Sequence, residues 1–151
     1  MDKNKITSVR EEIVSTIQTY NQARTDYAKL ERQIGTIALA LHKAIYKKDN
    51  KQMPCSSFDR FVYIEKSDCI KAYVRTYRDC YPDEEEYTIP IYFMTLDEDE
   101  LEQEICGLAD KYIDQRNKKR EAARKKYQEL KDAEELKELE RLKAKYESGD
   151  N

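Results

Sequence analysis

The sequence contains no tryptophan and has only three glycines, three prolines and one histidine among 151 residues. Glycine and proline mark turns, so their scarcity predicts long regular elements joined by few loops. Three isolated glycines cannot form the glycine-rich loop that holds the phosphates of a nucleotide. No run of about 18 apolar residues is present, so the sequence predicts no membrane-spanning helix.

The N-terminal residues also lack the apolar stretch of a secretory signal peptide. We therefore expect a cytoplasmic protein, in which thiols stay reduced. No two cysteines lie closer than eleven residues, which excludes a CxxC redox or zinc pair. Roles in the protein interior are expected for all four, which are Cys55, Cys69, Cys80 and Cys106.

The residues that most chemistry needs are scarce or badly spaced. His42, the only histidine, lies within a helical pattern, "LALHKAIY", and is expected to be a packed or surface residue. The run "DEDELEQE" superficially resembles a calcium loop, but an EF-hand needs glycine at position six and glutamate at position twelve. Those positions hold Glu102 and Leu108. The sequence thus predicts no catalytic, cofactor or metal site and no enzyme.

Residues 6–50 predict one long helix with a heptad pattern. Apolar residues recur at every seventh position and again three residues after each, with Thr16 as the polar exception. The first set is Ile6, Ile13, Tyr20, Tyr27, Ile34 and Leu41, and the second is Val9, Ala23, Leu30, Ile37 and Ala44. A period of 3.5 residues places both sets in one stripe, which needs a partner helix to cover it.

Residues 57–94 have a different pattern, rich in β-branched and aromatic residues with partial alternation. They predict a three-stranded antiparallel meander, in which "DCYPDEEE" forms the loop before a third strand, "EYTIPIYFM". Pro90 lacks an amide donor, so this third strand should lie at a sheet edge or carry a bulge. Residues 68–78 predict a strand, with a short helix as the alternative.

Residues 96–147 predict a second long helix, and residues 148–151 a frayed tail. The fold class is therefore α+β, in a single elongated domain that spans residues 1–151. Because both helices carry one apolar stripe, we expect an antiparallel coiled-coil hairpin with the small sheet inserted between its helices. About 38 residues of sheet rarely sustain a core alone, so a homodimer through the coiled-coil helices is also expected.

Charge is strongly segregated along the chain. Residues 79–110 contain twelve acidic and no basic side chains, whereas the flanking segments are both net positive. An acid near a helix start contributes about 0.3–1 kcal/mol, and the effect fades after one turn, so capping explains only a few of the twelve. Such a concentration of like charge repels internally, which points to a use outside the fold.

We interpret this acidic stretch as a surface that docks a protein partner with a basic face. The loop between the second and third strands and the start of the second helix would present it together at one end of the sheet. Tyrosines nearby would add contact area. The predicted partner-binding residues are Asp83, Glu84, Glu85, Glu86, Asp97, Glu98, Asp99, Glu100, Tyr81 and Tyr87.

Two alternatives follow from charge alone. Carboxylates arrayed on a rod can imitate nucleic-acid phosphates, as in small phage inhibitors of the anti-restriction and anti-CRISPR class, which block a nuclease or DNA-binding protein. The basic stretch Arg116–Lys126 has seven lysines and arginines and is a candidate for direct nucleic-acid binding. It lacks interleaved aromatic residues, so a solvated helix face is its simpler interpretation.

The element order of long helix, small sheet and long helix resembles that of prefoldin subunits, which also place β-hairpins between two coiled-coil helices. The resemblance implies a coiled-coil chaperone or scaffold whose helix tips hold client proteins. Function would then depend on exposed apolar residues far along the second helix, namely Leu136, Leu139 and Leu142.

Overall fold

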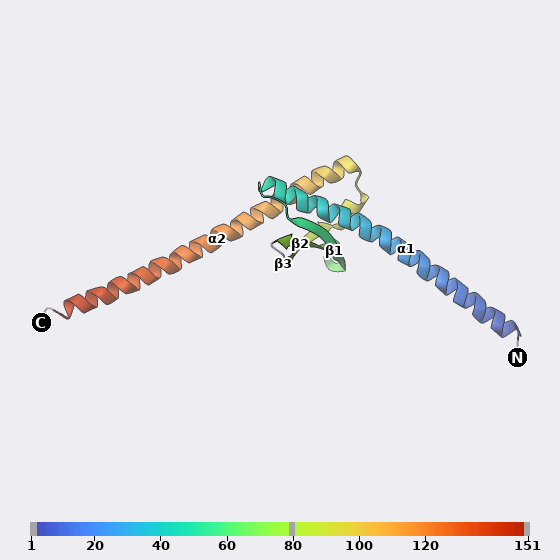
Figure 1. Ribbon diagram of the computed structural model, residues 1–151, viewed down its shortest axis with the longest axis horizontal. Helices are drawn as coiled ribbons and strands as arrows, with labels where there is room; N and C mark the ends of the chain where they lie inside the picture. Colours follow the sequence, from blue (N-terminus) through green and yellow to red (C-terminus); the bar gives the residue numbers. More distant parts are fainter. Residues whose placement is uncertain (1–2, 79–80, 150–151) are drawn as a thin grey trace. The chain divides into compact units, whose positions relative to one another are not determined.

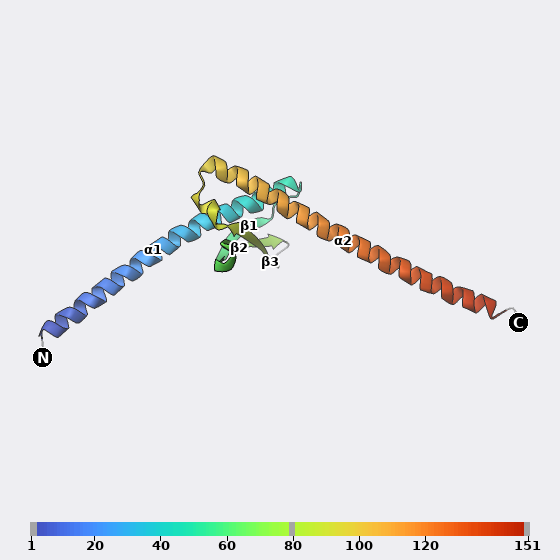
Figure 2. The same cartoon turned by 180° about the vertical axis from the view of Figure 1, so that it is seen from behind.

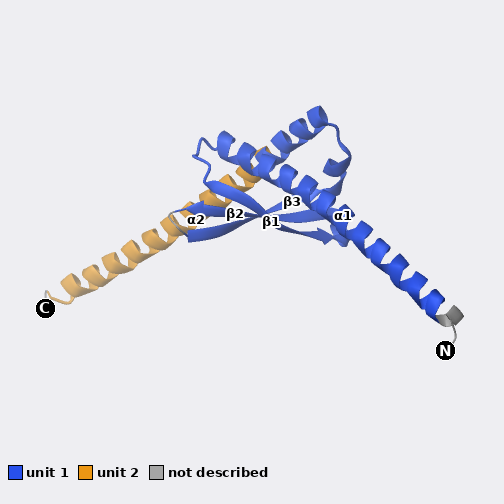
Figure 3. Ribbon diagram, turned by 45° about the vertical axis from the view of Figure 1, so that its right-hand side comes forward, with its two compact units in different colours: residues 1–109 blue, residues 110–151 orange. Residues whose placement is uncertain are grey.

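The computed structural model describes residues 3–78 and 81–149, and it shows an α+β fold (Figure 1). A three-stranded antiparallel sheet lies in the chain between two long helices. The chain divides into two compact units, residues 1–109 and residues 110–151 (Figure 3). The first unit contains the sheet, the whole first helix and the start of the second. The second unit is the remainder of the second helix and the residues after it.

The first helix, α1, spans Lys3–Lys48 and confirms the helix predicted over residues 6–50. It ends where Asn50 takes a left-handed conformation with a φ of 51°. The amide of Lys51 donates to the carbonyl of Tyr46 at 3.1 Å, and the amide of Asn50 donates to that of Lys47 at 3.3 Å. This pair of bonds around a left-handed residue is a Schellman ending, which satisfies carbonyls that the helix leaves free.

The sheet consists of β1 (Cys55–Ile64), β2 (Cys69–Arg78) and β3 (Tyr81–Pro90) in the order β1-β2-β3. Both neighbouring pairs are antiparallel, which confirms the predicted meander and the strand over 68–78. The strand with Pro90 is an edge strand, as predicted. A one-turn helix, η1 (Glu65–Ser67), joins the first two strands, and Asp68 closes it with a left-handed φ of 47°.

The predicted limits of the third strand were wrong at both ends. The acidic residues 83–86 belong to β3 rather than to a loop, because each pairs in register with β2, and Arg75 stands opposite Glu84. Opposite charges across a strand pair offset the poor strand propensity of glutamate. At the other end the strand stops at Pro90, which has no amide proton for the ladder. A short helix, η2 (Ile91–Thr95), follows it.

The core of the first unit forms where the second half of α1 lies on one face of the sheet (Figure 2). The buried helix residues are Ile34, Ile37, Ala38, Leu41, His42, Ile45 and Tyr46. The buried sheet residues are Ile70, Ala72, Val74, Thr76, Tyr87 and Ile89, with Phe93, Ile105 and Ala109 beside them. On β2 and β3 the buried positions alternate with more exposed ones, as expected for a sheet covered on one face.

The second helix, α2, spans Glu98–Glu147 and confirms the helix predicted over 96–147. The carboxylate of Asp97 caps it by accepting the amide of Glu100 at 2.9 Å. Its first turns lie beside the end of α1, where Lys48 Nζ donates to the carbonyl of Cys106 at 3.2 Å. Of the predicted tail, Ser148 and Gly149 form a turn, and residues 150–151 lie outside the described residues.

The predicted coiled-coil pairing of the two helices is not shown. Heptad residues from Ile34 onward are covered by the sheet, whereas those from Ile6 to Leu30 are exposed. Within residues 1–109, α2 begins beside Thr36 and Ala40 and reaches Lys48, so it runs away from the first half of α1. The apolar stripe of α1 therefore has one covered half and one uncovered half.

Two helical glycines give a matched test of these contacts. A Cβ on Gly107 meets nothing within 4 Å, whereas a Cβ on Gly35 lies 3.0 Å from Cδ1 of Phe58. We expect Gly107→Ala to raise the free energy of unfolding by about 0.5–1 kcal/mol, the usual advantage of alanine in a helix. Crowding against Phe58 should cancel this gain in Gly35→Ala. Urea denaturation of both variants checks this, and equal gains would mean that α1 and β1 are not in close contact.

Candidate interaction surfaces

The outer face of the sheet carries a ladder of opposite charges across all three strands. Arg60 of β1 forms two bonds with Glu84 of β3, at 2.6 and 3.0 Å. Asp59 accepts a bond from Arg75 of β2 at 3.0 Å. Lys71 of β2 lies 2.8 Å from Glu86 of β3. The carboxylates of β3 thus neutralise bases of the neighbouring strands.

A cation–π contact adds to this ladder, and its hydrogen bonds shift the pKa of two of its members. The guanidinium of Arg60 lies 4.1 Å from the ring centre of Tyr73, a cation–π arrangement. The hydrogen bond from Lys71 holds the pKa of Glu86 below its ordinary value, although partial desolvation opposes the shift. The hydrogen bonds that Arg60 donates to Glu84 and Asp59 raise the pKa of Arg60, which stays charged. Glu84 and Glu86 are therefore each paired with a base of a neighbouring strand.

Glu85 faces the opposite side of β3 and enters the core. Its two oxygens accept bonds from the hydroxyls of Tyr46 and Tyr87, both at 2.6 Å. Arg78 donates in turn to the Tyr46 hydroxyl at 2.6 Å. Burial and the neighbouring Glu85 both raise the pKa of Tyr46, which keeps this hydroxyl protonated and able to donate. Glu85 is thus a structural acceptor between α1 and β3.

His42 extends this network to the first strand. Its side chain is fully buried, with Nδ1 2.6 Å from the Tyr87 hydroxyl and Nε2 2.9 Å from Ser56 Oγ. Ser56 also donates to the carbonyl of Pro54 at 2.9 Å. Among the described residues, no buried side-chain nitrogen or oxygen lacks a hydrogen-bond partner. The sequence indicated a packed or surface histidine, and the structure places it at the centre of the buried polar contacts.

The start of α2 holds the rest of the predicted acidic surface. Asp97 is used as the cap, whereas Glu98, Asp99 and Glu100 are exposed. No hydrogen bond or ion pair joins the side chains of these three to another residue in the described part of the chain. Of the eight predicted acidic contacts, these are the ones whose carboxylates face solvent most freely.

The structure does not bring the two acidic segments together, which corrects the predicted single acidic end. Glu85 bonds Tyr46, whereas the carbonyl of Met94, just before α2, accepts a bond from Gln33 at 3.1 Å. Gln33 and Tyr46 are thirteen residues apart on α1, roughly 20 Å at 1.5 Å per residue. The error came from placing residues 83–86 in a loop instead of along a strand.

The predicted tyrosine contacts also differ from each other. Tyr81 is 78% exposed, but Tyr87 is 2% exposed and offers no ring surface to a partner. Tyr92 of η2 is half exposed and donates to Glu104 at 2.7 Å. The basic stretch Arg116–Lys126 lies within α2 and is mostly exposed, as a solvated helix face would be.

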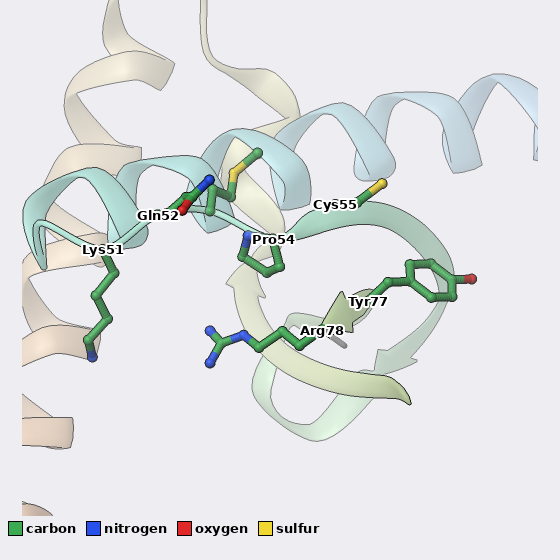
Figure 4. Close-up of a pocket in the computed structure, with 7 residues that line it drawn as sticks. Lys51, Gln52, Pro54, Cys55, Tyr77 and Arg78 are labelled. Carbon is green, nitrogen blue, oxygen red and sulfur yellow. The ribbon is translucent and has the colours of Figure 1, made fainter. Parts of the chain in front are cut away.

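A pocket with two cations in its lining opens where α1 meets β1 (Figure 4). It has a volume of about 560 Å³, and its cations, Lys51 and Arg78, extend to one side of it. Lys51 forms an ion pair with Asp49, and Arg78 bonds the Tyr46 hydroxyl. Both cations therefore already have partners from the same unit.

The first half of α1 presents an extended apolar surface. Eight large side chains there are between 41% and 65% exposed. They are Ile6, Val9, Ile13, Val14, Ile17, Tyr20, Tyr27 and Leu30. The sequence identified the heptad stripe to which six of them belong, but it indicated that another helix of the same chain would cover it.

No protein-family model, curated protein or solved structure matches this chain. Within the part that the structure describes, no group of three or more histidine, cysteine or acidic side chains is arranged to hold a metal ion. Of the helices in the described ranges, none has the length and apolar character needed to cross a membrane. Cys55, Cys69 and Cys106 are free thiols, and Cys80 lies outside the described residues. Cys55 and Cys106 are exposed, so the interior roles predicted for these two were wrong.

Proposed function

We propose that this chain is a protein–protein interaction module that binds a helix along the first half of α1. The observation that carries the proposal is the uncovered heptad stripe between Ile6 and Leu30. The same stripe is covered from Ile34 onward, where the sheet lies on it. A helix with a 3.5-residue apolar period is typical of one that is covered by a second helix.

The energetics of exposure support a binding role. Fully burying a valine, leucine or isoleucine side chain gains about 1.5–3 kcal/mol, and these side chains are about half exposed. Monomeric proteins rarely expose apolar patches of this extent unless the patch is used. The opposite face of the helix is polar and includes Glu11, Gln18 and Thr25. One face is thus suited to a partner and the other to water.

Docking of a basic partner by carboxylates is the second candidate, and it now depends on the start of α2. The supporting observation is that Glu98, Asp99 and Glu100 are exposed and unpaired within the described residues. The ion pairs of Glu84 and Glu86 weaken the case for phosphate mimicry, which needs an array of carboxylates free of neighbouring bases.

The test places a photo-reactive benzoylphenylalanine at Tyr20 and maps its adducts by mass spectrometry in cells that express the chain. We expect adducts on a helical segment of a partner. Ile13→Glu with Ile17→Glu should abolish them, because Ile13 lies on the stripe, Ile17 lies on its flank, and the two are 54% and 53% exposed. The matched control, Gln18→Glu with Thr25→Glu, adds the same charge to the opposite face and should leave them intact.

Two outcomes would contradict the proposal. Adducts that persist in the Ile13 and Ile17 variant would show that the stripe does not bind the partner. Adducts confined to α2 of the same chain would instead support the intrachain coiled-coil hairpin. A partner lost only when Glu98, Asp99 and Glu100 are changed to lysine would favour the acidic docking surface.

A further inference from the structure

We infer that the helix covering the stripe is α1 of a second copy of this chain, in antiparallel orientation. The inference rests on the proposed function, and it names the partner and its register. It follows from the charged residues that flank the stripe, because flanking charges select the partner and orientation of coiled-coil helices.

The two flanks of the stripe carry different charges. The residues that follow each d position of the heptad are Arg10, Ile17, Arg24 and Glu31. Those that precede each a position are Glu12, Thr19, Asp26 and Gln33. Parallel helices pair one flank with the other, whereas antiparallel helices pair each flank with itself. The charges therefore distinguish the two orientations.

A parallel pair of identical α1 helices is disfavoured by its flanks. It places Asp26 of one copy against Glu31 of the other, and symmetry repeats this like-charge contact. The other flanking contacts of the parallel pair each join a charged residue to an uncharged one, since Glu12 meets Ile17 and Thr19 meets Arg24. No attractive pair compensates for the repulsion between Asp26 and Glu31.

One antiparallel register removes this repulsion and matches side-chain sizes. It sets Tyr20 opposite Ala23 of the second copy and thereby places Arg10 opposite Glu31 twice, once in each direction. Thr16 then faces Tyr27, so each tyrosine of the stripe meets a small residue. Sliding the helices by one heptad instead opposes Arg10 to Arg24 and Glu12 to Asp26. Charge and size thus select the same register.

The sheet limits the paired segment in this register. It buries the stripe from Ile34 onward, so the pairing runs from Ile13 to Leu30 and ends before Val9 of one copy would meet Ile34 of the other. Within this segment the ring of Tyr27 stacks on Phe61 of β1 at 5.5 Å between centroids, and the residue opposite Tyr27 is the small Thr16. The paired segment is roughly 27 Å long at 1.5 Å per residue.

The test is a charge swap, with the dissociation constant of the dimer measured by sedimentation equilibrium of the full chain at low salt. Arg10→Glu and Glu31→Arg should each weaken the dimer roughly tenfold, which corresponds to about 1.4 kcal/mol. The double swap restores opposite charges across the pair and should return the constant to near that of the unaltered chain. The differences should shrink at about 1 M salt, where exposed charges are screened.

Different results would contradict the orientation of the helices, their register or the dimer itself. A stronger dimer in Glu31→Arg alone would indicate the parallel pair, because Asp26 would then face an arginine. Single and double swaps with equal constants would contradict the register. A chain that stays monomeric well above micromolar concentration would overturn this inference. Adducts between another protein and the benzoylphenylalanine placed at Tyr20 would then leave the proposed function standing. The absence of such adducts would overturn both proposals.

Discussion

Replacing His42 with alanine is expected to lower the free energy of unfolding by about 3–5 kcal/mol, a large fraction of the stability of a typical domain. The side chain is fully buried and bonds Tyr87 and Ser56 at its two ring nitrogens. Alanine would leave a cavity and would remove one hydrogen bond from each hydroxyl, while Tyr87 keeps its bond to Glu85 and Ser56 its bond to Pro54. Each lost hydrogen bond costs about 0.5–1.5 kcal/mol.

Tyrosine fluorescence during urea denaturation measures this effect, since the chain has twelve tyrosines and no tryptophan. The exposed helical ends contribute to far-UV circular dichroism whether or not the core is formed, so the core needs this separate signal. Lys43→Ala is the matched control, because Lys43 neighbours His42 on α1 but is exposed. A loss below about 1 kcal/mol for His42→Ala, within the range of ordinary surface changes, would show that the network does not hold α1 to the sheet.

Removing the carboxylate of Glu85 is the second change with a large expected effect. Glu85→Ala should lower the free energy of unfolding by about 2–4 kcal/mol, because the Tyr46 and Tyr87 hydroxyls would both lose their acceptor. Its side chain is 23% exposed, so water replaces part of what is lost. This keeps the expected cost below that of a fully buried charge partner.

Asp83 gives the control for Glu85, since it lies on the same strand and its carboxylate accepts the amide of Glu84 at 2.8 Å but forms no ion pair with another described residue. Asp83→Ala should change stability by less than about 0.5 kcal/mol. Equal, small effects at both positions would contradict the placement of Glu85 in the core. They would also restore the interpretation of residues 83–86 as a solvent-facing docking surface.

The contrast between these acids shows where sequence reasoning was insufficient. Glu84, Glu85 and Glu86 are consecutive and chemically alike, yet two face solvent beside bases and one enters the core. Alternation along a strand makes this difference, and it applies only once the strand and its register are known. A loop, which the run of acids suggested, carries no such alternation.

The elements of this protein are largely determined by the sequence itself. The heptad period specifies α1, the residues around Asn50 end it, and Asp97 starts α2. Alternating β-branched and aromatic residues specify the strands, and the near absence of glycine and proline keeps both helices long. These features depend on neighbours within a few residues, so a local pattern is sufficient to predict them.

Only the tertiary structure decided which surfaces are covered. The sheet could lie on any part of the α1 stripe, and its contact with Ile34 to Tyr46 leaves Ile6 to Leu30 uncovered. The register of β3 against β2 decided that Glu84 and Glu86 join an ion-pair ladder and that Glu85 meets Tyr46 and Tyr87. Both outcomes depend on contacts between residues far apart in the chain, whose energies no local pattern contains.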